Sequence, residues 1–329
     1  MKHSTKTIVV IVNFNGKEFL CRCLESLARQ TFSNFKTVIV DNFSQDGSVD
    51  EVENLFPNVK VVRLDKNMGF SAANNYAIEQ AQDFHWVALL NPDTKVEPDW
   101  LLNLHIAAEE NPEYEFFGSH LRKQNSLGKL DGTGDVYHLC GLAWRRDHGM
   151  PENQTSRSVG EIFSPCAAAA MYRRDIFIDV GGFDERFFCY FEDVDLAFRL
   201  RLKGYRCLYV PSAKVEHFGS GITGRRSDFA VYHGHRNMVW AYVKNMPSLL
   251  LWCGLPQHIL ANVAALVFFS LTGQGGAIFK AKKDAFLGLK KTLEQRKLIQ
   301  KNKIISSKSL KKIIATGWFL PYFKNRKLK

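Results

Sequence analysis

The first hundred residues alternate between short, β-branched segments and segments with helical spacing of apolar side chains. Strands are expected at residues 7–12, 37–40, 59–64 and 86–90, and helices at 17–29, 48–56 and 72–81. Parallel strands must be joined by crossover connections, which helices of this length provide. The sequence therefore predicts an α/β fold, with a mostly parallel sheet that is covered by helices on both faces.

Each of these predicted strands is followed by polar side chains. They are Asn13 and Asn15 after the first strand, Asp41 and Asn42 after the second, Asn67 after the third, and Asn91 and Asp93 after the fourth. In open parallel sheets, ligands bind beyond the carboxyl ends of the strands. The pattern predicts a binding site at that edge, for a ligand rich in hydrogen-bonding groups.

The remaining sequence is less regular. Residues 115–165 are rich in glycine, histidine and charge, which favours loops that cover a site, whereas a helix is expected at 192–203 and a strand at 205–211. A hydrophobic content of 46% and a charged content of 23% exclude a disordered chain. Seven cysteines without paired spacing, and no secretion signal, indicate reduced thiols in the cytoplasm.

Positive charge is concentrated at the C-terminal end. Residues 280–329 hold 16 Lys and Arg against Asp284 and Glu294, a net +14, whereas the rest of the chain carries −3. Such a segment suits an anionic membrane surface. Nucleic-acid binding is the competing interpretation, but no nucleic-acid-binding motif accompanies the charge, so we expect no nucleic-acid partner.

The most hydrophobic stretch, residues 249–271, precedes this basic segment. It is interrupted by Pro256, His258 and Asn262, and no apolar run in it exceeds seven residues. It therefore falls short of the roughly 18 apolar residues of a clean membrane-spanning helix. As a helix it would carry small and polar residues on one side, which predicts either a helix in the membrane interface or one packed into the protein.

Several acidic and amide side chains have residue types that suit ligand binding. Asp41, with Asn13 and Asn15 nearby, could bind a nucleobase or a ribose, whereas Ser44 and Ser48 favour a turn and a helix cap. Gly69 follows Asn67 and opens a helix whose N-terminus could attract phosphate, although many helices begin this way.

Two further residues have the chemistry of metal ligands. Asp93 could hold a divalent cation that bridges a diphosphate, or it could form a Pro-Asp turn. His217 precedes a glycine-rich segment, and both a ligand role and a core position stay open for it.

Three carboxylates follow an aromatic cluster at residues 187–191. Asp195 can pair with Arg199 one helical turn later, which indicates a structural role. Asp193 has no such partner at residue 197, which is alanine. A carboxylate beside bulky aromatic side chains in a cleft could act as a general base.

Six of these segments, in this order, resemble the family 2 glycosyltransferases, which are inverting enzymes with the GT-A fold. The segments are Ile11-Val12-Asn13-Phe14-Asn15, Val40-Asp41-Asn42-x-Ser44-x-Asp46-Gly47-Ser48, Asn67-x-Gly69-Phe70-x-x-Ala73-Asn74-Asn75, Leu90-Asn91-Pro92-Asp93-Thr94, Val180-Gly181-Gly182-Phe183-Asp184-Glu185 and Tyr190-Phe191-Glu192-Asp193-Val194-Asp195-Leu196. The resemblance covers about residues 5–240. It looks most like bacterial rhamnosyltransferases that build O-antigen or other cell-surface polysaccharides.

The resemblance implies three regions and a set of roles. The regions are a GT-A domain at 1–240, a hydrophobic helical membrane-associating segment at 241–279 and a basic tail at 280–329. The donor nucleotide sugar would be bound by Asn13, Asn15, Asp41, Asn42, Asn67, Gly69 and Asn74. Mg²⁺ or Mn²⁺ would be held by Asp93, with His217 and, more weakly, Asn91. Asp193 would be the general base, and Glu192, Arg225 and Arg226 would contact the diphosphate or the acceptor.

The implied activity is transfer of a single sugar, L-rhamnose from dTDP-rhamnose, to a polyprenyl diphosphate-linked saccharide at the inner face of the cell membrane. The Gln-x-x-Arg-Trp motif of processive synthases is absent from the sequence. A UDP-hexose donor and a non-catalytic nucleotide-sugar-binding scaffold are the alternatives, and a homo-oligomer stays open. A nicotinamide-dependent dehydrogenase is disfavoured, because Asn13-Phe14-Asn15-Gly16 is not the required Gly-x-Gly-x-x-Gly.

Overall fold

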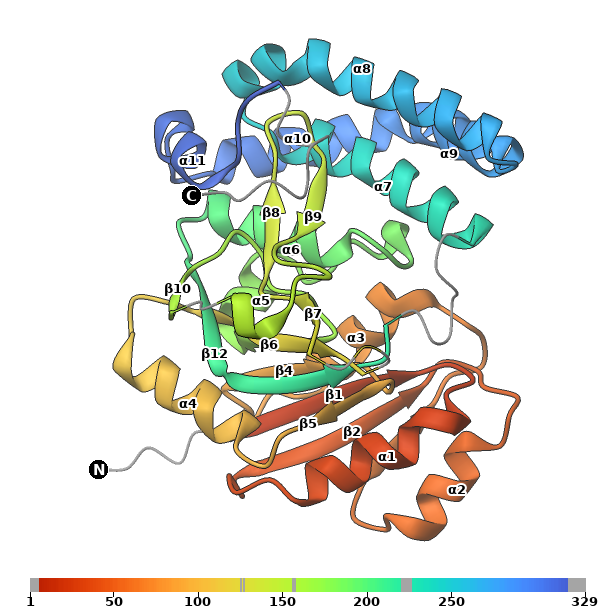
Figure 1. Ribbon diagram of the computed structural model, residues 1–329, viewed down its shortest axis with the longest axis vertical. Coiled ribbons are helices and arrows are strands. Elements are labelled where there is room, and N and C mark those ends of the chain that lie inside the picture. The colour runs from red at the N-terminus through yellow and green to blue at the C-terminus, as the bar shows by residue number, and fades with distance from the viewer. Residues whose placement is uncertain (1–5, 125, 127, 156–157, 220–226, 319–329) are drawn as a thin grey trace.

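The computed structural model describes residues 6–124, 126, 128–155, 158–219 and 227–318, and a ten-stranded sheet lies at its centre (Figure 1). The strand order is β10-β12-β6-β11-β4-β1-β2-β3, with β5 paired to β12 and β7 paired to β6. The strands are β1 (Thr7–Asn13), β2 (Phe35–Asp41), β3 (Lys60–Arg63), β4 (Trp86–Leu90), β5 (Thr94–Val96), β6 (Phe116–Lys123), β7 (Leu130–Gly132), β10 (Gly160–Glu161), β11 (Ala169–Arg173) and β12 (Cys207–His217).

The first four strands form the parallel part of the sheet. β1 pairs with β2 and β4, and β2 pairs with β3, all in parallel. The connecting helices are α1 (Lys17–Ala28), α2 (Ser48–Leu55) and α3 (Gly69–Glu79). Every residue of β1 is buried, as expected for a strand covered on both faces. The predicted α/β class and the order of its first seven elements are confirmed.

The prediction of loops that cover a site over residues 115–165 was wrong at 116–123, which form β6, although residues 135 and 143–145 do line the cavity described below. β6 lies in the middle of the sheet, between β12 and β11, and its first six residues are buried. Because both faces of β6 are covered, its side chains do not alternate in polarity. At Gly118 of β6 a Cβ would lie 2.9 Å from Ile162, so this glycine permits close packing within the sheet. The same region also forms a hairpin of β8 (Asp135–Tyr137) and β9 (Ala143–Arg145).

β12 was predicted to end at Pro211, but it continues to His217. The pairing of β12 with β6 is irregular between Val210 and Lys214, so the proline sits at a bulge rather than in the regular ladder. Proline is tolerated at such a position because its missing N–H is not needed there. Two further helices complete this part: α4 (Trp100–Glu110) and α5 (Arg174–Asp179).

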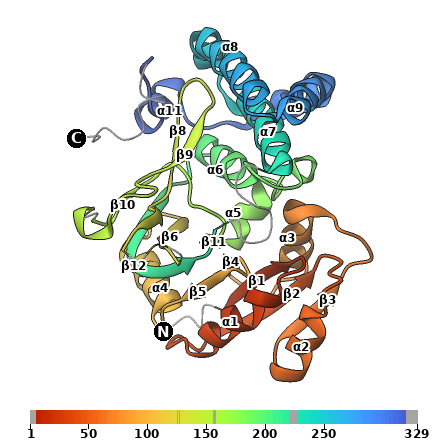
Figure 2. The same cartoon turned by 45° about the vertical axis from the view of Figure 1, so that its right-hand side comes forward.

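The C-terminal part is helical and lies on one side of the sheet (Figures 1 and 2). Its helices are α7 (Asp228–Asn245), α8 (Ser248–Leu271), α9 (Gly275–Leu287), α10 (Leu289–Asn302) and α11 (Ser307–Ile313). α7 packs on α6 (Glu192–Leu202), α9 and α10. Much of the basic segment therefore forms helices that pack on the rest of the protein.

α8 divides into a protein-facing side and an exposed apolar side. Gly254, Gln257 and His258 are buried, and His258 Nδ1 lies 2.7 Å from the carbonyl oxygen of Cys140 in the β8–β9 hairpin. The exposed side chains include Trp252, Ile259, Val263, Val267 and Leu271. By length and average composition α8 is long and apolar enough to cross a membrane, although its interrupted apolar runs predicted that it would fall short. The helical spacing predicted this division into a small, polar side and an opposite apolar side.

Candidate active site

A cavity of about 780 Å³ opens at the carboxyl ends of the parallel strands. Its walls include strand-end residues, an aromatic loop, the start of α6 and the β8–β9 hairpin. Predicted site residues that line it are Asn42, Asn67, Gly69, Asn91, Asp93, Glu192, Asp193 and His217. Residues from positions 12 to 234 therefore meet at the edge of the sheet where a ligand site was expected.

Asn42 and Asn67 connect the loops after β2 and β3. Asn42 Nδ2 donates to Asn67 Oδ1 at 2.9 Å, and Asn42 Oδ1 accepts from the backbone N–H of Met68 at 2.8 Å. Asn67 Oδ1 also accepts from the backbone N–H of Gly69 at 2.9 Å. We call Asn42, Asn67 and Gly69 the strand-end wall of the cavity.

Four predicted donor-binding residues do not line the cavity. Asn13 is buried and donates to the hydroxyls of Ser44 and Ser48, and Asp41 accepts from the backbone N–H of Ser44. Asn15 accepts from the backbone N–H of Gln45, and Asn74 donates to the carbonyl oxygen of Phe70 within its own helix. In this structure these side chains stabilise the loops around the cavity.

Asp93 and His217 lie side by side because β5 pairs with the end of β12, with Thr94 opposite His217. His217 Nε2 is 3.4 Å from Asp93 Oδ1, and both side chains are buried. The neighbouring Asn91 lines the cavity, and its carbonyl oxygen accepts from the Thr94 hydroxyl at 2.6 Å, which closes the turn.

Asp131, which sequence reasoning missed, orients His217. Its Oδ2 lies 2.8 Å from His217 Nδ1, which leaves Nε2 directed to Asp93. Burial opposes the charge of the imidazolium, but hydrogen bonds to Asp131 and Asp93 outweigh it and raise the pKa of His217. A histidine whose second nitrogen is held by a carboxylate is typical of metal ligands. Within the described ranges, no group of three or more His, Cys, Asp and Glu side chains is arranged to hold a metal.

The aromatic loop, residues 187–191, has an unusual backbone. Phe188, Tyr190 and Phe191 all have positive φ angles, which L-residues adopt only when their surroundings impose them. Part of the constraint comes from α3: a Cβ on Gly69 would lie 2.5 Å from the Phe188 ring, so only glycine fits there.

The remaining constraint comes from α7. Asn237, which is fully buried, donates from Nδ2 to the carbonyl oxygens of Phe187, Cys189 and Tyr190 at 2.9, 3.0 and 2.7 Å. One amide from a distant helix therefore holds three carbonyl groups of the aromatic loop. We call this loop, with the start of α6, the helix-held wall of the cavity.

Asp193 stands at the start of α6, where the aromatic loop ends. Its Oδ2 accepts from the backbone N–H of Ala167 at 3.2 Å, and its Oδ1 from that of Val194 at 2.8 Å. Burial raises the pKa of Asp193, although these hydrogen bonds oppose the shift. Burial, and then the charge of Asp193, raise the pKa of the neighbouring Glu192. A carboxylate with a raised pKa is a stronger base, as proton abstraction requires.

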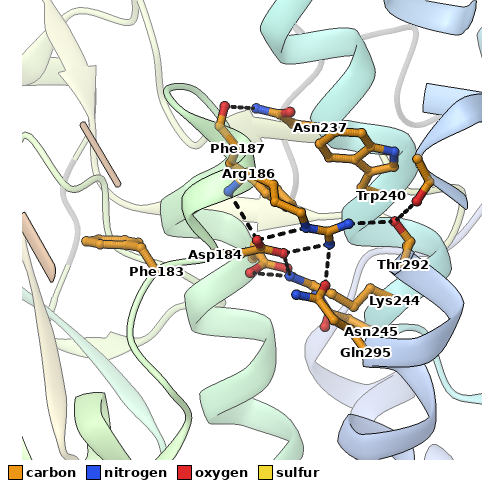
Figure 3. Close-up of polar contacts among 12 residues, drawn as sticks. Phe183, Asp184, Arg186, Phe187, Asn237, Trp240, Lys244, Asn245, Thr292 and Gln295 are labelled. Carbon is orange, nitrogen blue, oxygen red and sulfur yellow. Dashed lines mark hydrogen bonds and ion pairs between the residues drawn. The ribbon is translucent and has the colours of Figure 1, made fainter. Parts of the chain in front are cut away.

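A network of buried charges fixes this wall to the C-terminal helices (Figure 3). Lys244 Nζ on α7 lies 2.8 Å from Asp184 Oδ2 and 2.8 Å from Asp195 Oδ1 on α6. Asp184 also pairs with Arg186, which contacts Gln295 on α10. Asp195 pairs with Arg199 at 2.9 Å, as its helical spacing predicted.

The β8–β9 hairpin contributes residues that the sequence did not single out: Asp135, Trp144 and Arg145 all line the cavity. The available signal was the glycine-spaced acid pair Asp131-Gly-Thr-Gly-Asp135, in a stretch that we interpreted as loop. Arg225 and Arg226 lie outside the described residues.

A mostly parallel sheet with a ligand-sized cavity at the carboxyl ends of its strands, lined by a buried Asp–His pair and by Asp193, is typical of nucleotide-binding α/β enzymes. The chain belongs to glycosyl transferase family 2, whose model matches residues 8–181, and it is a glycosyltransferase. It is 31% identical over 250 residues to the N-acetylglucosaminyl-diphospho-decaprenol L-rhamnosyltransferase of Mycobacterium tuberculosis. The aligned region covers 68% of this chain and 80% of that protein.

Two solved structures share the fold. GalNAc-T7 with UDP, GalNAc and Mn²⁺ matches with a TM-score of 0.61 at 16% identity, over 78% of this chain and 52% of that one. Residues 1–349 of TarS from S. aureus, in complex with UDP-GlcNAc, match with a TM-score of 0.55 at 18% identity, over 90% of both chains. The GT-A fold and the rhamnosyltransferase-like family predicted from the motifs are confirmed.

Proposed function

We propose that this protein is an inverting rhamnosyltransferase that moves a single L-rhamnose from dTDP-rhamnose to a lipid-linked saccharide. We infer the reaction type from the position of Asp193, a carboxylate of raised pKa that lines the same cavity as Asp93 and His217. The similarity to the mycobacterial rhamnosyltransferase, whose name specifies an N-acetylglucosaminyl-diphospho-decaprenol, supports the choice of sugar and acceptor.

In the proposed mechanism, the Asp193 carboxylate accepts the proton of an acceptor hydroxyl. The hydroxyl oxygen attacks the anomeric carbon from the face opposite the nucleoside diphosphate. The new glycosidic C–O bond forms as the bond from that carbon to the diphosphate oxygen breaks, and the configuration inverts. Asn42, Asn67 and the N-terminus of α3 at Gly69 would bind the nucleotide and orient the donor.

The residues at the end of β12 fit a divalent cation. Asp93 offers a carboxylate, His217 offers a nitrogen that Asp131 orients, and Asn91 is a weaker oxygen ligand. Asp93 and His217 would be the two strong protein ligands of the cation. When bound, Mg²⁺ or Mn²⁺ would neutralise negative charge on the departing diphosphate.

The exposed face of α8 and the basic residues after it favour a peripheral position on the cytoplasmic side of an anionic membrane. Trp252, Val263 and Leu271 are at least half exposed there. In-plane contact of such a face with lipid would bring the enzyme to a polyprenyl-linked acceptor. The regions 1–240, 241–279 and 280–329 would then serve as the catalytic part, the membrane-contacting part and its basic extension.

The test is a nucleoside-diphosphate release assay with dTDP-rhamnose, UDP-hexoses and GDP-sugars, on protein reconstituted with anionic vesicles. Prenyl diphosphate-linked N-acetylglucosamine is the acceptor. Asp193→Asn should lower kcat by about 10²- to 10⁴-fold with little change in donor affinity, because it removes the base and keeps the shape. Asp83→Asn, which alters an exposed carboxylate in a turn, is the matched control.

Each result of this assay tests a different part of the proposal. EDTA should abolish release, and Mg²⁺ or Mn²⁺ should restore it. Full activity in Asp193→Asn would show that Asp193 is not the base. A preference for a UDP-hexose would show that dTDP-rhamnose is not the donor. No release from any donor would support a non-catalytic nucleotide-sugar-binding scaffold.

A further inference from the structure

Asp135 is a buried carboxylate in the cavity that the proposed mechanism does not use. It begins β8, directly after Gly134, and only 7% of its surface is exposed. Gly134 has a φ of +105° and packs against Ile162, so the backbone that places Asp135 is fixed. Both Asp135 and Asp193 line the cavity.

The backbone around Asp135 connects it to the base. The N–H of Asp135 donates to the carbonyl oxygen of Ser164 at 2.7 Å. The hydroxyl of Ser164 lies 3.4 Å from the carbonyl oxygen of Asp193. Ser164 therefore contacts the backbones of both Asp135 and Asp193. The base and the second carboxylate consequently form adjacent parts of one wall.

The Asp135 carboxylate has no hydrogen-bond partner or ion pair among the described residues, although most buried carboxylates are paired. Arg145 stands opposite Asp135 in the hairpin, but its guanidinium pairs with Asp131 and donates to Cys166 Sγ at 3.0 Å. Burial, and then the charge of Asp193, raise the pKa of Asp135 to about 7. The charge of Arg145 opposes this shift only in part. The carboxylate lines the cavity, so it is available to accept a hydrogen bond from a ligand there.

We propose that Asp135 binds a hydroxyl of the acceptor sugar, next to the hydroxyl that Asp193 deprotonates, and so positions and selects the acceptor. This inference rests on the proposed function. The nucleotide is assigned to Asn42 and Asn67 and the diphosphate to Asp93 and His217, whereas Asp135 neighbours the base. Trp144, opposite the next residue of β8, also lines the cavity and adds an apolar surface for a sugar ring.

The experiment measures acceptor binding and turnover separately. Calorimetry with short-chain prenyl diphosphate-linked N-acetylglucosamine, in the presence of dTDP, gives the acceptor Kd for the wild type, Asp135→Asn and Asp83→Asn. A lost hydrogen bond to a charged group predicts a rise in acceptor Kd and KM of about 10- to 100-fold in Asp135→Asn. The Kd of dTDP-rhamnose should change by less than about twofold, and kcat should fall less than KM rises.

Stability distinguishes a binding role from a structural one. Asp135→Asn should melt at the same temperature as the wild type or higher at pH 7.5, because it removes an unpaired buried charge. A lower Tm would assign Asp135 to the fold and overturn the proposal. Unchanged acceptor Kd, or a weakened donor Kd instead, would also overturn it.

These outcomes are independent of the test of the proposed function. If the wild type binds the acceptor probe and Asp135→Asn does not weaken it, the role of Asp135 fails even when transfer is observed. If the wild type turns over no donor but loses acceptor affinity in Asp135→Asn, the catalytic assignment fails and the binding role of Asp135 stands. A wild-type protein that does not bind prenyl diphosphate-linked N-acetylglucosamine would contradict both the proposed function and the role of Asp135.

Discussion

The two walls of the cavity are built by different means. In the strand-end wall, Asn42 and Asn67 bond to each other and to the backbone within two neighbouring loops. In the helix-held wall, Asp193 follows a loop with three positive φ angles, and residues of α7 and α10 hold that loop and α6 in place. The proposed nucleotide-binding residues are therefore positioned by local structure, whereas the proposed base, Asp193, depends on distant helices.

This difference separates binding from turnover. Damage to the strand-end wall should weaken nucleotide binding and leave the fold nearly intact. Damage to the contacts of α7 should lower stability and turnover together, with nucleotide binding retained wherever the variant folds. Three substitutions test this division, in order from the largest expected effect to the smallest.

Lys244→Met should cause the largest loss of stability. It removes the ammonium group between Asp184 and Asp195 and leaves buried carboxylates less compensated, at a cost of about 3–5 kcal/mol. Burial opposes ionisation of Asp184, but Lys244 and Arg186 hold its pKa well below the ordinary 3.8. The contribution of this pair is therefore present above about pH 4 and is lost as the pH falls further.

Urea unfolding at pH 7 and at pH 3.5 checks this prediction. The deficit of Lys244→Met relative to the wild type should be large at pH 7 and smaller at pH 3.5. Lys203→Met, which breaks a pair with Asp179 near the surface, is the control and should cost less than about 1 kcal/mol. Equal deficits at the two pH values would show that Lys244 acts through packing rather than charge.

Asn237→Asp should have an intermediate effect. It replaces an amide that donates to three carbonyl groups with a carboxylate that repels them, which should cost about 2–3 kcal/mol and lower kcat. Fluorescence-detected unfolding and the nucleotide-release assay measure the two effects. Asn103→Asp alters a half-buried amide that donates a single bond to the carbonyl oxygen of Ser212, and it should change both quantities much less. Retained kcat in Asn237→Asp would contradict the assigned function of α7.

Asn42→Ala should have the smallest effect on the fold. Loss of its bonds to Asn67 and Met68 should raise the Kd of dTDP by about 5- to 30-fold, with a small change in Tm. Calorimetric titration with dTDP measures this. Asn15→Ala removes an exposed amide outside the cavity and should bind dTDP almost normally. Comparable weakening in both variants would extend the nucleotide site beyond the strand-end wall.

The sequence predicted the strand-end wall well because its signals are local. Asn42 and Asn67 each closely follow a strand of the parallel part, and parallel pairing brings such positions to one edge. The same signal located Asp93, which lies beside this wall. The same rule also selected Asn13 and Asp41, whose side chains turn to serine residues 44 and 48 or to the backbone instead. Position along a strand predicts the edge on which a residue lies, but the direction of its side chain depends on neighbouring loops.

The helix-held wall was predicted only in part. Asp193 stood out through its acidic, aromatic surroundings, but nothing near Asn237 or Lys244 indicates that they contact residues 184–195. Asp131 and Asp135 lie in a segment whose strands are short or buried on both faces, so neither apolar periodicity nor length distinguished them from loop. Contacts between residues far apart in the sequence leave no periodic trace.

The dependence of the aromatic loop on α7 and α10 has a consequence for biosynthesis. Chains are made from the N-terminus, so the strands of the parallel part leave the ribosome long before Asn237, Lys244 and Gln295 do. We expect a nascent chain to assemble the strand-end wall at that stage, before the contacts from α7 and α10 restrain the loop that precedes Asp193. We therefore expect group transfer to begin only when the last helices have docked.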